Sequence, residues 1–293
     1  MNATARLDVV VVSWRCEDLL RRCLASLRDH PAGMPARVHV VDNASRDGTA
    51  EMVAAEFPEV ELTVNAENLG FSAANNIALR RSDADYLLVL NPDTRLTEGA
   101  LDTLLGLLGA NPKVGICGPR LELPDGTFDH ASRRSFPTPI SALGHFSGIG
   151  RRLGSGPLAD YRAPQVERGP VDAVNGAFMM IRRAALDEVG LFDEGYWMYM
   201  EDLDLCYRFK QAGWEIWFEP EVTVIHEKAG TSGPERSPRL NRAFHAGMLR
   251  FYRDHYAPQR PMLVNGAVYA GVGVKLAVSL IRGAVRRAVL RFR

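Results

Sequence analysis

Paired cysteines are missing from this sequence. Its four cysteines, Cys16, Cys23, Cys117 and Cys206, are scattered along 293 residues and form no C-x-x-C pair. This argues against a zinc cluster and against a disulfide framework. Isolated cysteines of this kind are typical of small, reduced core residues, and they favour a cytoplasmic protein.

A charge excess and a long apolar leader are also lacking. Lysine plus arginine and aspartate plus glutamate each number 35, so no global field would attract nucleic acid, and we predict no nucleic-acid partner. The apolar run VVVV at 9–12 is too short for a signal peptide. We therefore expect the main body to stay in the cytoplasm. Neither G-x-G-x-x-G nor G-x-x-x-x-G-K-[ST] occurs, which argues against a dehydrogenase and a nucleoside triphosphatase.

What the sequence does contain is an alternation of short β-rich runs with helical patterns. The predicted strands are 7–14, 37–43, 60–64, 85–93 and 113–119, and the predicted helices between them are 17–29, 47–57, 72–82 and 98–110. Strands that are apolar on both faces and alternate with helices imply an α/β fold with a mostly parallel central sheet covered on both faces. Ligands of such a sheet bind at the carboxyl ends of its strands.

The second half of the chain is less regular. Residues 137–170 are rich in Gly, Pro and Ser and are predicted to form a long excursion. Beyond it, 171–181 and 214–225 are predicted strands, and 201–212 is the helix between them. We assign one catalytic domain to 1–258.

The remaining residues, 259–293, form a separate C-terminal segment. Its stretch 262–281 is apolar and about as long as a membrane span, but Lys275 interrupts it. Lys275, Arg282, Arg286 and Arg293 fall on one helical stripe, which favours a basic amphipathic helix in the surface of an anionic membrane. The alternative is a helix packed on the body or on a partner subunit, and homo-oligomerisation stays open.

Polar residues follow the ends of the predicted strands. Asp42 and Asn43 close the second strand, and Asn91, Pro92 and Asp93 close the fourth. Asp93 could cap a helix or serve as the hard oxygen ligand of a divalent cation, with His226 at the end of another strand as a candidate second ligand. Gly70, in the turn ENLGFS, precedes a helix start that could attract an anion.

The stretch YMEDLDLCYRF at 199–209 places three carboxylates among apolar residues. A buried acid is costly unless it is paired, so Glu201 and Asp202 mark either a salt-bridged helix start or a catalytic carboxylate. Asp204 is expected to be solvated or paired with Arg208 at i+4.

Taken together, these motifs resemble family 2 glycosyltransferases of the GT-A fold, and within them the bacterial rhamnosyltransferase-like branch. The matching segments are VVSW, VVDNASRDGT, ENLGFSAANN, LNPDTRL, VNGAFMMIRRAALDEVGLFDEGYWMYMEDLDLCYR and WFEPEVTVIH. The resemblance covers about 7–255 and does not extend to the 137–170 excursion or the tail.

The resemblance implies a site for a nucleotide sugar. Ser13, Trp14 and Asp42 lie where such enzymes hold the base and ribose, and Asn68 and Asn76 lie where they line the same pocket. The donor would carry a diphosphate, and the family binds it with a divalent cation.

The resemblance also implies a metal site for Mg²⁺ or Mn²⁺. Asn91 and Asp93 stand at the D-x-D position, so Asp93 would bind the metal, while Asn91 replaces the first carboxylate. His226 matches the histidine that often completes the metal or diphosphate site. Gly176 and Ala177 fall where the backbone approaches the donor sugar.

Glu201 and Asp202 match the family's E-D pair, in which Asp202 would be the general base and Glu201 would orient the acceptor or position Asp202. Trp197 and Tyr199 could stack on a sugar or fill the core. Arg134 and its neighbour Arg133 could bind the diphosphate of a lipid-linked acceptor or belong to a solvated turn.

The resemblance therefore implies an inverting glycosyltransferase of cell-envelope polysaccharide synthesis. It would move L-rhamnose from dTDP-rhamnose to a saccharide or polyprenyl-diphosphate-linked acceptor, as a peripheral protein at the inner face of the cell membrane. The alternatives are a UDP-sugar donor carrying GlcNAc, galactose or a furanose, and a non-catalytic subunit that binds nucleotides or saccharides.

Overall fold

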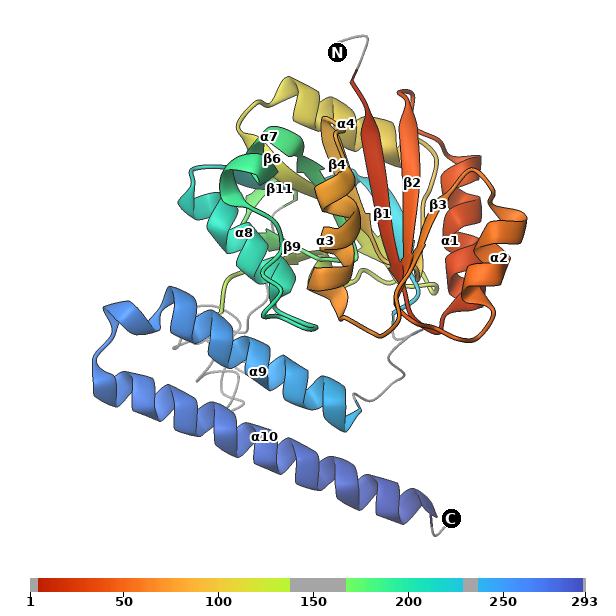
Figure 1. The fold of residues 1–293 in the computed structure, drawn as a ribbon. Helices are drawn as coiled ribbons and strands as arrows, with labels where there is room; N and C mark the ends of the chain where they lie inside the picture. The colour runs from red at the N-terminus through yellow and green to blue at the C-terminus, as the bar shows by residue number, and fades with distance from the viewer. Residues whose placement is uncertain (1–4, 138–166, 229–236, 292–293) are drawn as a thin grey trace.

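The computed structural model describes residues 5–137, 167–228 and 237–291. Most of the predicted excursion, and Arg293 of the predicted basic stripe, therefore lie outside the described residues. The first half of the chain contains strands β1 (Leu7–Ser13), β2 (Ala36–Asp42), β3 (Glu61–Val64), β4 (Tyr86–Leu90), β5 (Thr94–Arg95) and β6 (Val114–Glu122). Between them lie helices α1 (Glu17–Asp29), α2 (Thr49–Glu56), α3 (Phe71–Arg81) and α4 (Ala100–Ala110). The predicted alternation of strands and helices is confirmed (Figure 1).

The second half completes the same sheet. Its strands are β7 (Arg133–Arg134), β8 (Gly169–Val171), β9 (Ala173–Val174), β10 (Phe178–Arg182) and β11 (Glu215–His226). Its helices are η1 (His130–Ser132), α7 (Arg183–Val189), α8 (Glu201–Gln211), α9 (Pro238–His255), η2 (Ala257–Gln259) and α10 (Met262–Arg291). The sequence analysis did not predict α7 or α9.

The central sheet has the strand order β3-β2-β1-β4-β10-β6-β11-β5, and β8 pairs with β11 at one side. Neighbours among β1, β2, β3 and β4 run parallel, as do β6 and β11. Strand β10 runs antiparallel to both β4 and β6, so the predicted parallel sheet has a mixed centre. A separate pair, β7 with β9, lies beside it.

Helices cover both faces of the sheet. On one face α1, α2 and α4 pack against Val9 and Val11 of β1. On the other face α3, α7 and α8 pack against Val10 of the same strand. Because successive side chains of a strand point to opposite faces, a strand buried on both sides is apolar at most of its positions. This explains the uninterrupted valine run.

The strand register brings the polar strand ends to one rim. Ser13 at the end of β1 lies opposite Asp42 at the end of β2. On the other side of β1, Val11 lies opposite Leu90, the last residue of β4. The turn that carries Asp93 starts directly after Leu90, so the predicted ligand-binding edge is assembled as expected.

Helices α9 and α10 form an antiparallel hairpin beyond the end of the body opposite the N-terminus (Figure 1). Two polar contacts fix the hairpin: Nδ2 of Asn241 lies 2.8 Å from Oγ of Ser279, and the hydroxyl of Tyr252 lies 2.7 Å from Oδ1 of Asn265. Helix α10 confirms that the C-terminal segment is helical. It is long and apolar enough, by length and composition, to cross a membrane over Met262–Arg286.

Candidate functional site

The predicted nucleotide end of the site is built around Asp42. Its carboxylate is buried, accepts hydrogen bonds from Ser13 Oγ at 3.2 Å and from the backbone N–H of Ser45 at 3.1 Å, and also contacts the Ser45 hydroxyl. Trp14, directly after Ser13, is 36% exposed. A fixed carboxylate beside an accessible indole is an arrangement that suits a ribose hydroxyl and a flat base.

The turn that contains Gly70 packs against the loop before α8. Gly70 has a φ of +86°, and a Cβ placed there would lie 2.2 Å from the backbone oxygen of Trp197. The N–H of Phe71 donates to that same oxygen at 2.8 Å, and the N–H of Gly70 donates to Asn68 Oδ1 at 2.9 Å. These two N–H groups are thus used inside the protein, and anion binding by the following N–H groups of α3 stays a prediction.

Asn68 and Asn76 both hold loops in place. Asn68 also accepts from Nδ2 of Asn43 at 3.1 Å. Asn76 is fully buried, and its Nδ2 donates to the backbone oxygen of Phe192 at 2.8 Å and to Glu194 at 2.9 Å. The hydrogen-bonding groups of Asn76 therefore fix the loop that leads to α8, and contact with a nucleotide by either asparagine stays a prediction.

Asp93 and His226 come together at the rim. Oδ1 of Asp93 lies 3.5 Å from Nε2 of His226, and both side chains are buried. Burial alone would lower the pKa of His226, but its interactions with the carboxylates of Asp129 and Asp93 outweigh it and raise this pKa to about 9. Asp129 was not among the predicted site residues, because nothing distinguishes a single Asp in a turn.

This pair fits a hard divalent cation. Within the described residues, Oδ1 of Asp93 is buried and has no hydrogen-bond partner. A carboxylate oxygen and an imidazole nitrogen are ligands that suit Mg²⁺ or Mn²⁺. No group of three His, Cys, Asp or Glu side chains that could hold a metal occurs among the described residues. Substrate phosphates would therefore have to complete the coordination.

The segment Gly176–Ala177 joins the two halves of the site. Its Ala177 oxygen accepts from the backbone N–H of Asn91 at 2.9 Å, so it fixes the turn that carries Asp93. Its Gly176 N–H donates to Oδ2 of Asp202 at 2.9 Å. A Cβ on Gly176 would lie 3.3 Å from that carboxylate, a tight approach for a side chain.

Asp202 lies in the first turn of α8 and is largely buried. Besides Gly176, its Oδ2 is paired with Arg134 from β7, and its Oδ1 accepts from the N–H of Leu203 at 2.8 Å. Arg134 also donates to the oxygen of Val174 at 2.9 Å. The structure therefore places Arg134 in a pair with the predicted base and not in a solvated turn.

Glu201 is buried beside Asp202. Oxygen Oε2 of Glu201 has no hydrogen-bond partner among the described residues. Burial, with the nearby charge of Asp202, raises the pKa of Glu201 to about 8. The raised pKa favours the neutral acid, which can donate as well as accept a hydrogen bond.

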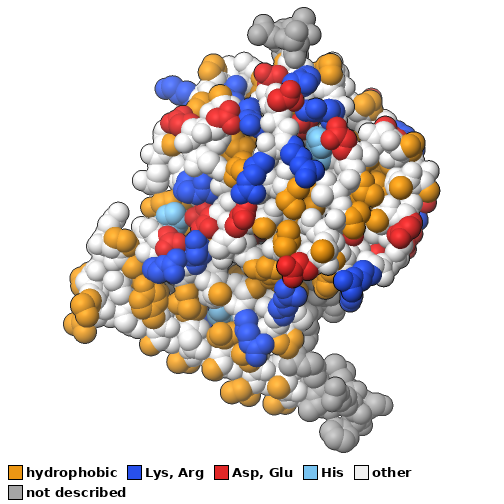
Figure 2. Space-filling model, in the orientation of Figure 1, with side chains coloured by type: hydrophobic (Ala, Val, Ile, Leu, Met, Phe, Trp, Pro, Cys, Tyr) orange, Lys and Arg blue, Asp and Glu red, His pale blue; other side chains and the backbone are white. Residues whose placement is uncertain are grey.

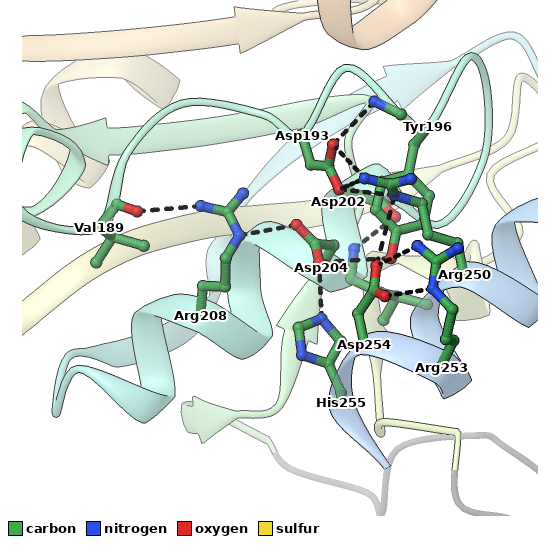
Figure 3. A network of polar contacts seen from close by, with 12 residues as sticks. Val189, Asp193, Tyr196, Asp202, Asp204, Arg208, Arg250, Arg253, Asp254 and His255 are labelled. Atoms are coloured by element: carbon green, nitrogen blue, oxygen red, sulfur yellow. Dashed lines mark hydrogen bonds and ion pairs between the residues drawn. The ribbon is translucent and has the colours of Figure 1, made fainter. Parts of the chain in front are cut away.

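Asp204 corrects one expectation. Instead of lying at the surface it is buried, and it is paired with Arg208 at 2.8 Å, as the i+4 spacing predicted, and with His255 at 2.7 Å (Figure 3). Burial would raise the pKa of Asp204, but His255 and Arg208 outweigh it and hold this pKa below its usual value. Helix α9 supplies His255, so this partner could not be found without the tertiary structure.

The side chains of Trp197, Tyr199 and Arg133, the remaining candidates for contact with a sugar or a diphosphate, pack against other side chains of the protein. Trp197 lies under the guanidinium of Arg239 at 4.0 Å, and Tyr199 packs edge-on against Phe244. The guanidinium of Arg133 lies between two aromatic rings, 5.1 Å from Phe128 and 4.9 Å from Phe218.

Residues with strained backbone conformations lie at the rim formed by the strand ends and the start of α8. Five non-glycine residues of the described chain have positive φ, and all follow β1 or β2 or precede α8: Arg15, Ala44, Arg46, Tyr199 and Met200. Such residues cost about 1–3 kcal/mol each and persist where the surrounding structure enforces them, often at functional sites. The concentration on one rim supports its assignment as the active site.

Comparison with known proteins identifies relatives of this chain. The family model described as "Glycosyl transferase family 2" matches residues 8–190. The N-acetylglucosaminyl-diphospho-decaprenol L-rhamnosyltransferase of Mycobacterium tuberculosis is 33% identical over 265 residues, which cover 86% of this chain and 85% of that protein. Rhamnosyltransferase WbbL of Escherichia coli is 31% identical over 166 residues, 54% of this chain and 60% of that protein.

Solved structures share the fold. Mannosyltransferase PcManGT from Pyrobaculum calidifontis, in complex with GDP-Man and Mn²⁺, aligns with a TM-score of 0.58 at 16% identity and covers 97% of this chain and 76% of that one. GalNAc-T7, with UDP, GalNAc and Mn²⁺, aligns with a TM-score of 0.57 at 17% identity, covering 77% of this chain and 44% of that one. The expected GT-A fold is confirmed. The chain belongs to glycosyl transferase family 2 and is a rhamnosyltransferase-like glycosyltransferase.

Proposed function

We propose that this enzyme is a metal-dependent, inverting transferase that moves a sugar from a nucleoside diphosphate to a lipid-linked saccharide in cell-envelope synthesis. The observation that carries the proposal is the position of Gly176–Ala177. This segment contacts Asp202 on one side and the turn of Asp93 on the other. A base and a diphosphate-binding turn fixed to one short segment are what an in-line displacement requires.

Asp202 would accept the proton of the acceptor hydroxyl. A hydroxyl is a poor nucleophile and loses its proton as it attacks the anomeric carbon, so a carboxylate within hydrogen-bond reach is needed. The contacts from Gly176 and Arg134 hold Asp202 in place for this step. Glu201, in its neutral form, can donate a hydrogen bond to the acceptor beside it.

On the departure side, Asp93 and His226 would hold the divalent cation, Mg²⁺ or Mn²⁺. When bound, the cation neutralises the charge that develops on the leaving diphosphate. Asp42 and Trp14 would hold the ribose and base at the other end of the donor. Two solved neighbours contain Mn²⁺ with a nucleotide or nucleotide sugar, which supports this assignment.

For the donor we propose dTDP-L-rhamnose, because two curated relatives carry the name rhamnosyltransferase. For the acceptor we propose a polyprenyl-diphosphate saccharide, as in the name of the mycobacterial relative. UDP-GlcNAc, UDP-galactose and a UDP-furanose remain the competing donors. Hydrolysis of a panel of these nucleotide sugars, with Mg²⁺ or Mn²⁺, separates them: preference for a UDP-sugar would reject the rhamnose assignment.

The role of Asp202 is tested by Asp202→Asn, which keeps the shape of the side chain and removes the base. We expect loss of transfer with nearly unchanged donor binding in calorimetry. Turnover comparable to the wild type would show that Asp202 is not the base. Asp187→Asn, at an exposed ion pair on α7, serves as the matched control and should leave turnover unchanged.

We also propose that α10 rests on the anionic inner surface of the cell membrane. Residues 256–293 contain seven of the 35 basic residues and none of the 35 acidic ones, so this segment is positively charged. The rest of the chain has 28 basic and 35 acidic residues and is therefore negatively charged. Only 6% of the apolar window of α10 is buried. Its exposed apolar side chains are visible along the lower part of the molecule in Figure 2. Basic residues near anionic headgroups contribute about 1 kcal/mol each.

A further inference from the structure

Asp129 is a buried carboxylate that the predicted site does not include. It lies in the turn between β6 and η1 and is 3% exposed. Its Oδ2 lies 3.2 Å from Nδ1 of His226, and its Oδ1 lies 2.7 Å from Nζ of Lys228. Oδ1 also accepts from the backbone N–H of Ala131 at 2.9 Å. These contacts hold both oxygens in fixed positions.

The two ring nitrogens of His226 face different carboxylates. Nδ1 faces Asp129 at 3.2 Å, whereas Nε2 faces Oδ1 of Asp93 at 3.5 Å, an oxygen with no hydrogen-bond partner among the described residues. Without a cation, the two carboxylates favour a proton on both ring nitrogens; a cation bound at Asp93 would take the place of the Nε2 proton, and Asp129 would keep the remaining proton on Nδ1. His226 is therefore oriented with Nε2 toward the position where a cation would bind Asp93.

We propose that Asp129 is a positioning residue: it holds His226 in the orientation and tautomer in which Nε2 can bind the divalent cation. Asp129 touches neither the cation nor the substrate. The inference rests on the proposed metal dependence of the enzyme, and it adds a residue that acts through His226.

Lys228 explains why a carboxylate is tolerated at this buried position. A buried acid without a cationic partner is costly. Lys228 supplies that cationic partner at Oδ1, while Oδ2 of Asp129 is directed at Nδ1 of His226.

The test measures binding of Mn²⁺ to the full-length protein in the presence of UDP or dTDP, by electron paramagnetic resonance, without any turnover. Loss of a residue that orients a metal ligand typically weakens binding about 10–100-fold. We expect Asp129→Asn to weaken Mn²⁺ binding by at least about tenfold. Asp125→Asn is the matched control, because Asp125 lies four residues earlier in the same turn, is exposed and accepts from Thr127. It should leave binding unchanged.

A double-mutant cycle shows whether Asp129 acts through His226. In a His226→Ala background, Asp129→Asn should cause little further loss, because the residue it positions is gone. An equal loss in both backgrounds would overturn the proposal, as would unchanged binding by Asp129→Asn in the wild-type background. Absence of Mn²⁺ binding by the wild type would instead reject the proposed metal dependence, so the two failures are distinguishable.

A measurement on the wild type keeps the proposal testable if Asp129→Asn does not fold. Nitrogen-15 NMR of the histidines, with Mg²⁺ and nucleoside diphosphate bound, reports which ring nitrogen carries the proton. We expect the proton of His226 on Nδ1. A proton on Nε2 in that complex would contradict the positioning role.

Discussion

Nε2 of His255 lies 2.7 Å from Oδ1 of Asp204, so the last residue of α9 is joined to the helix that carries Asp202 (Figure 3). On its other oxygen, Asp204 is paired with Arg208, which also donates to the backbone oxygen of Leu191 at 2.8 Å. One carboxylate therefore connects α8, α9 and the loop that leads to the active site. Through these contacts α9 stabilises the position of the predicted base.

We predict that Asp204→Asn strongly destabilises the protein. Removing one partner of a buried ion pair leaves the others uncompensated and costs about 3 kcal/mol or more. Asp187→Asn is the control: it breaks another i+4 pair with an arginine, but Asp187 is 59% exposed, so its loss should cost less than about 1 kcal/mol. Urea unfolding at pH 7 measures both. Equal losses would show that burial of Asp204 is energetically unimportant.

The same pair predicts a response to acid. The pKa of Asp204 is lower in the folded protein than its usual value, because His255 and Arg208 outweigh the effect of burial. The carboxylate therefore contributes stability above about pH 4, and this contribution is lost as the pH falls through the lower folded-state pKa. The difference in unfolding free energy between the wild type and Asp204→Asn should narrow below about pH 4. A constant difference down to pH 2 would contradict the assignment.

The buried Glu201 predicts the opposite dependence of folding stability on pH. Its pKa is raised to about 8 by burial and by the charge of Asp202. The folded state therefore loses stability as the pH rises from about 4.5 through 8, because Glu201 must ionise in a buried position. Glu201→Gln mimics the neutral acid and should flatten this part of the pH–stability curve. Thermal unfolding between pH 5 and 9 tests this, and an unchanged slope would reject it.

Much of this site followed from the sequence because it lies in local motifs. Asp42 ends the buried strand β2 and Asp93 lies in the turn after β4, and the register of these strands with β1 places their ends on one rim. The helix at Glu201 was predicted to within one residue of its observed end. Motifs of this kind are read from neighbours in the sequence, so tertiary contacts were not needed to find them.

The parts that were missed depend on contacts between distant segments. Asp129 gains its role from His226, 97 residues away, and Asp204 gains a partner from His255, 51 residues away. The antiparallel direction of β10 follows from the path of the chain through the sheet, which strand periodicity does not encode. The amphipathic helix α9 was overlooked although Ser237 caps it and Pro238 begins it, two recognisable start signals.

Gly70 gives a prediction about packing. Its φ is +86°, and an added Cβ would lie 2.2 Å from the oxygen of Trp197, so Gly70→Ala must displace backbone. We expect a loss of about 2 kcal/mol or more in unfolding free energy, with weaker donor binding because Trp197 moves. Gly106→Ala is the control: Gly106 is exposed on α4, and no described atom would lie within 4 Å of the new Cβ. Helix propensity should make it stabilising by about 0.5–1 kcal/mol.

The exposed face of α10 predicts binding to anionic lipid. Val274 and Ile281 are 64% and 63% exposed and lie seven residues apart, on one side of the helix. Burying each in the headgroup region would contribute about 1.5 kcal/mol or more, so replacing both with Glu should weaken vesicle binding about a hundredfold. Flotation with phosphatidylglycerol vesicles measures this, and high salt should weaken binding of the wild type as well. Ala54→Glu with Ala55→Glu, exposed on α2, adds the same charge away from α10 and should float like the wild type.

Deletion of 262–293 extends the same test. If α10 binds lipid, the shortened chain stays at the bottom of the gradient, and the wild type is monomeric without vesicles in light scattering. If the apolar face of α10 instead binds a second copy, the wild type is a dimer without lipid, Val274→Glu with Ile281→Glu makes it a monomer, and flotation does not depend on α10. The second pattern would reject membrane anchoring by this helix. Because both outcomes follow from the same two exposed side chains, the pair of measurements decides between them.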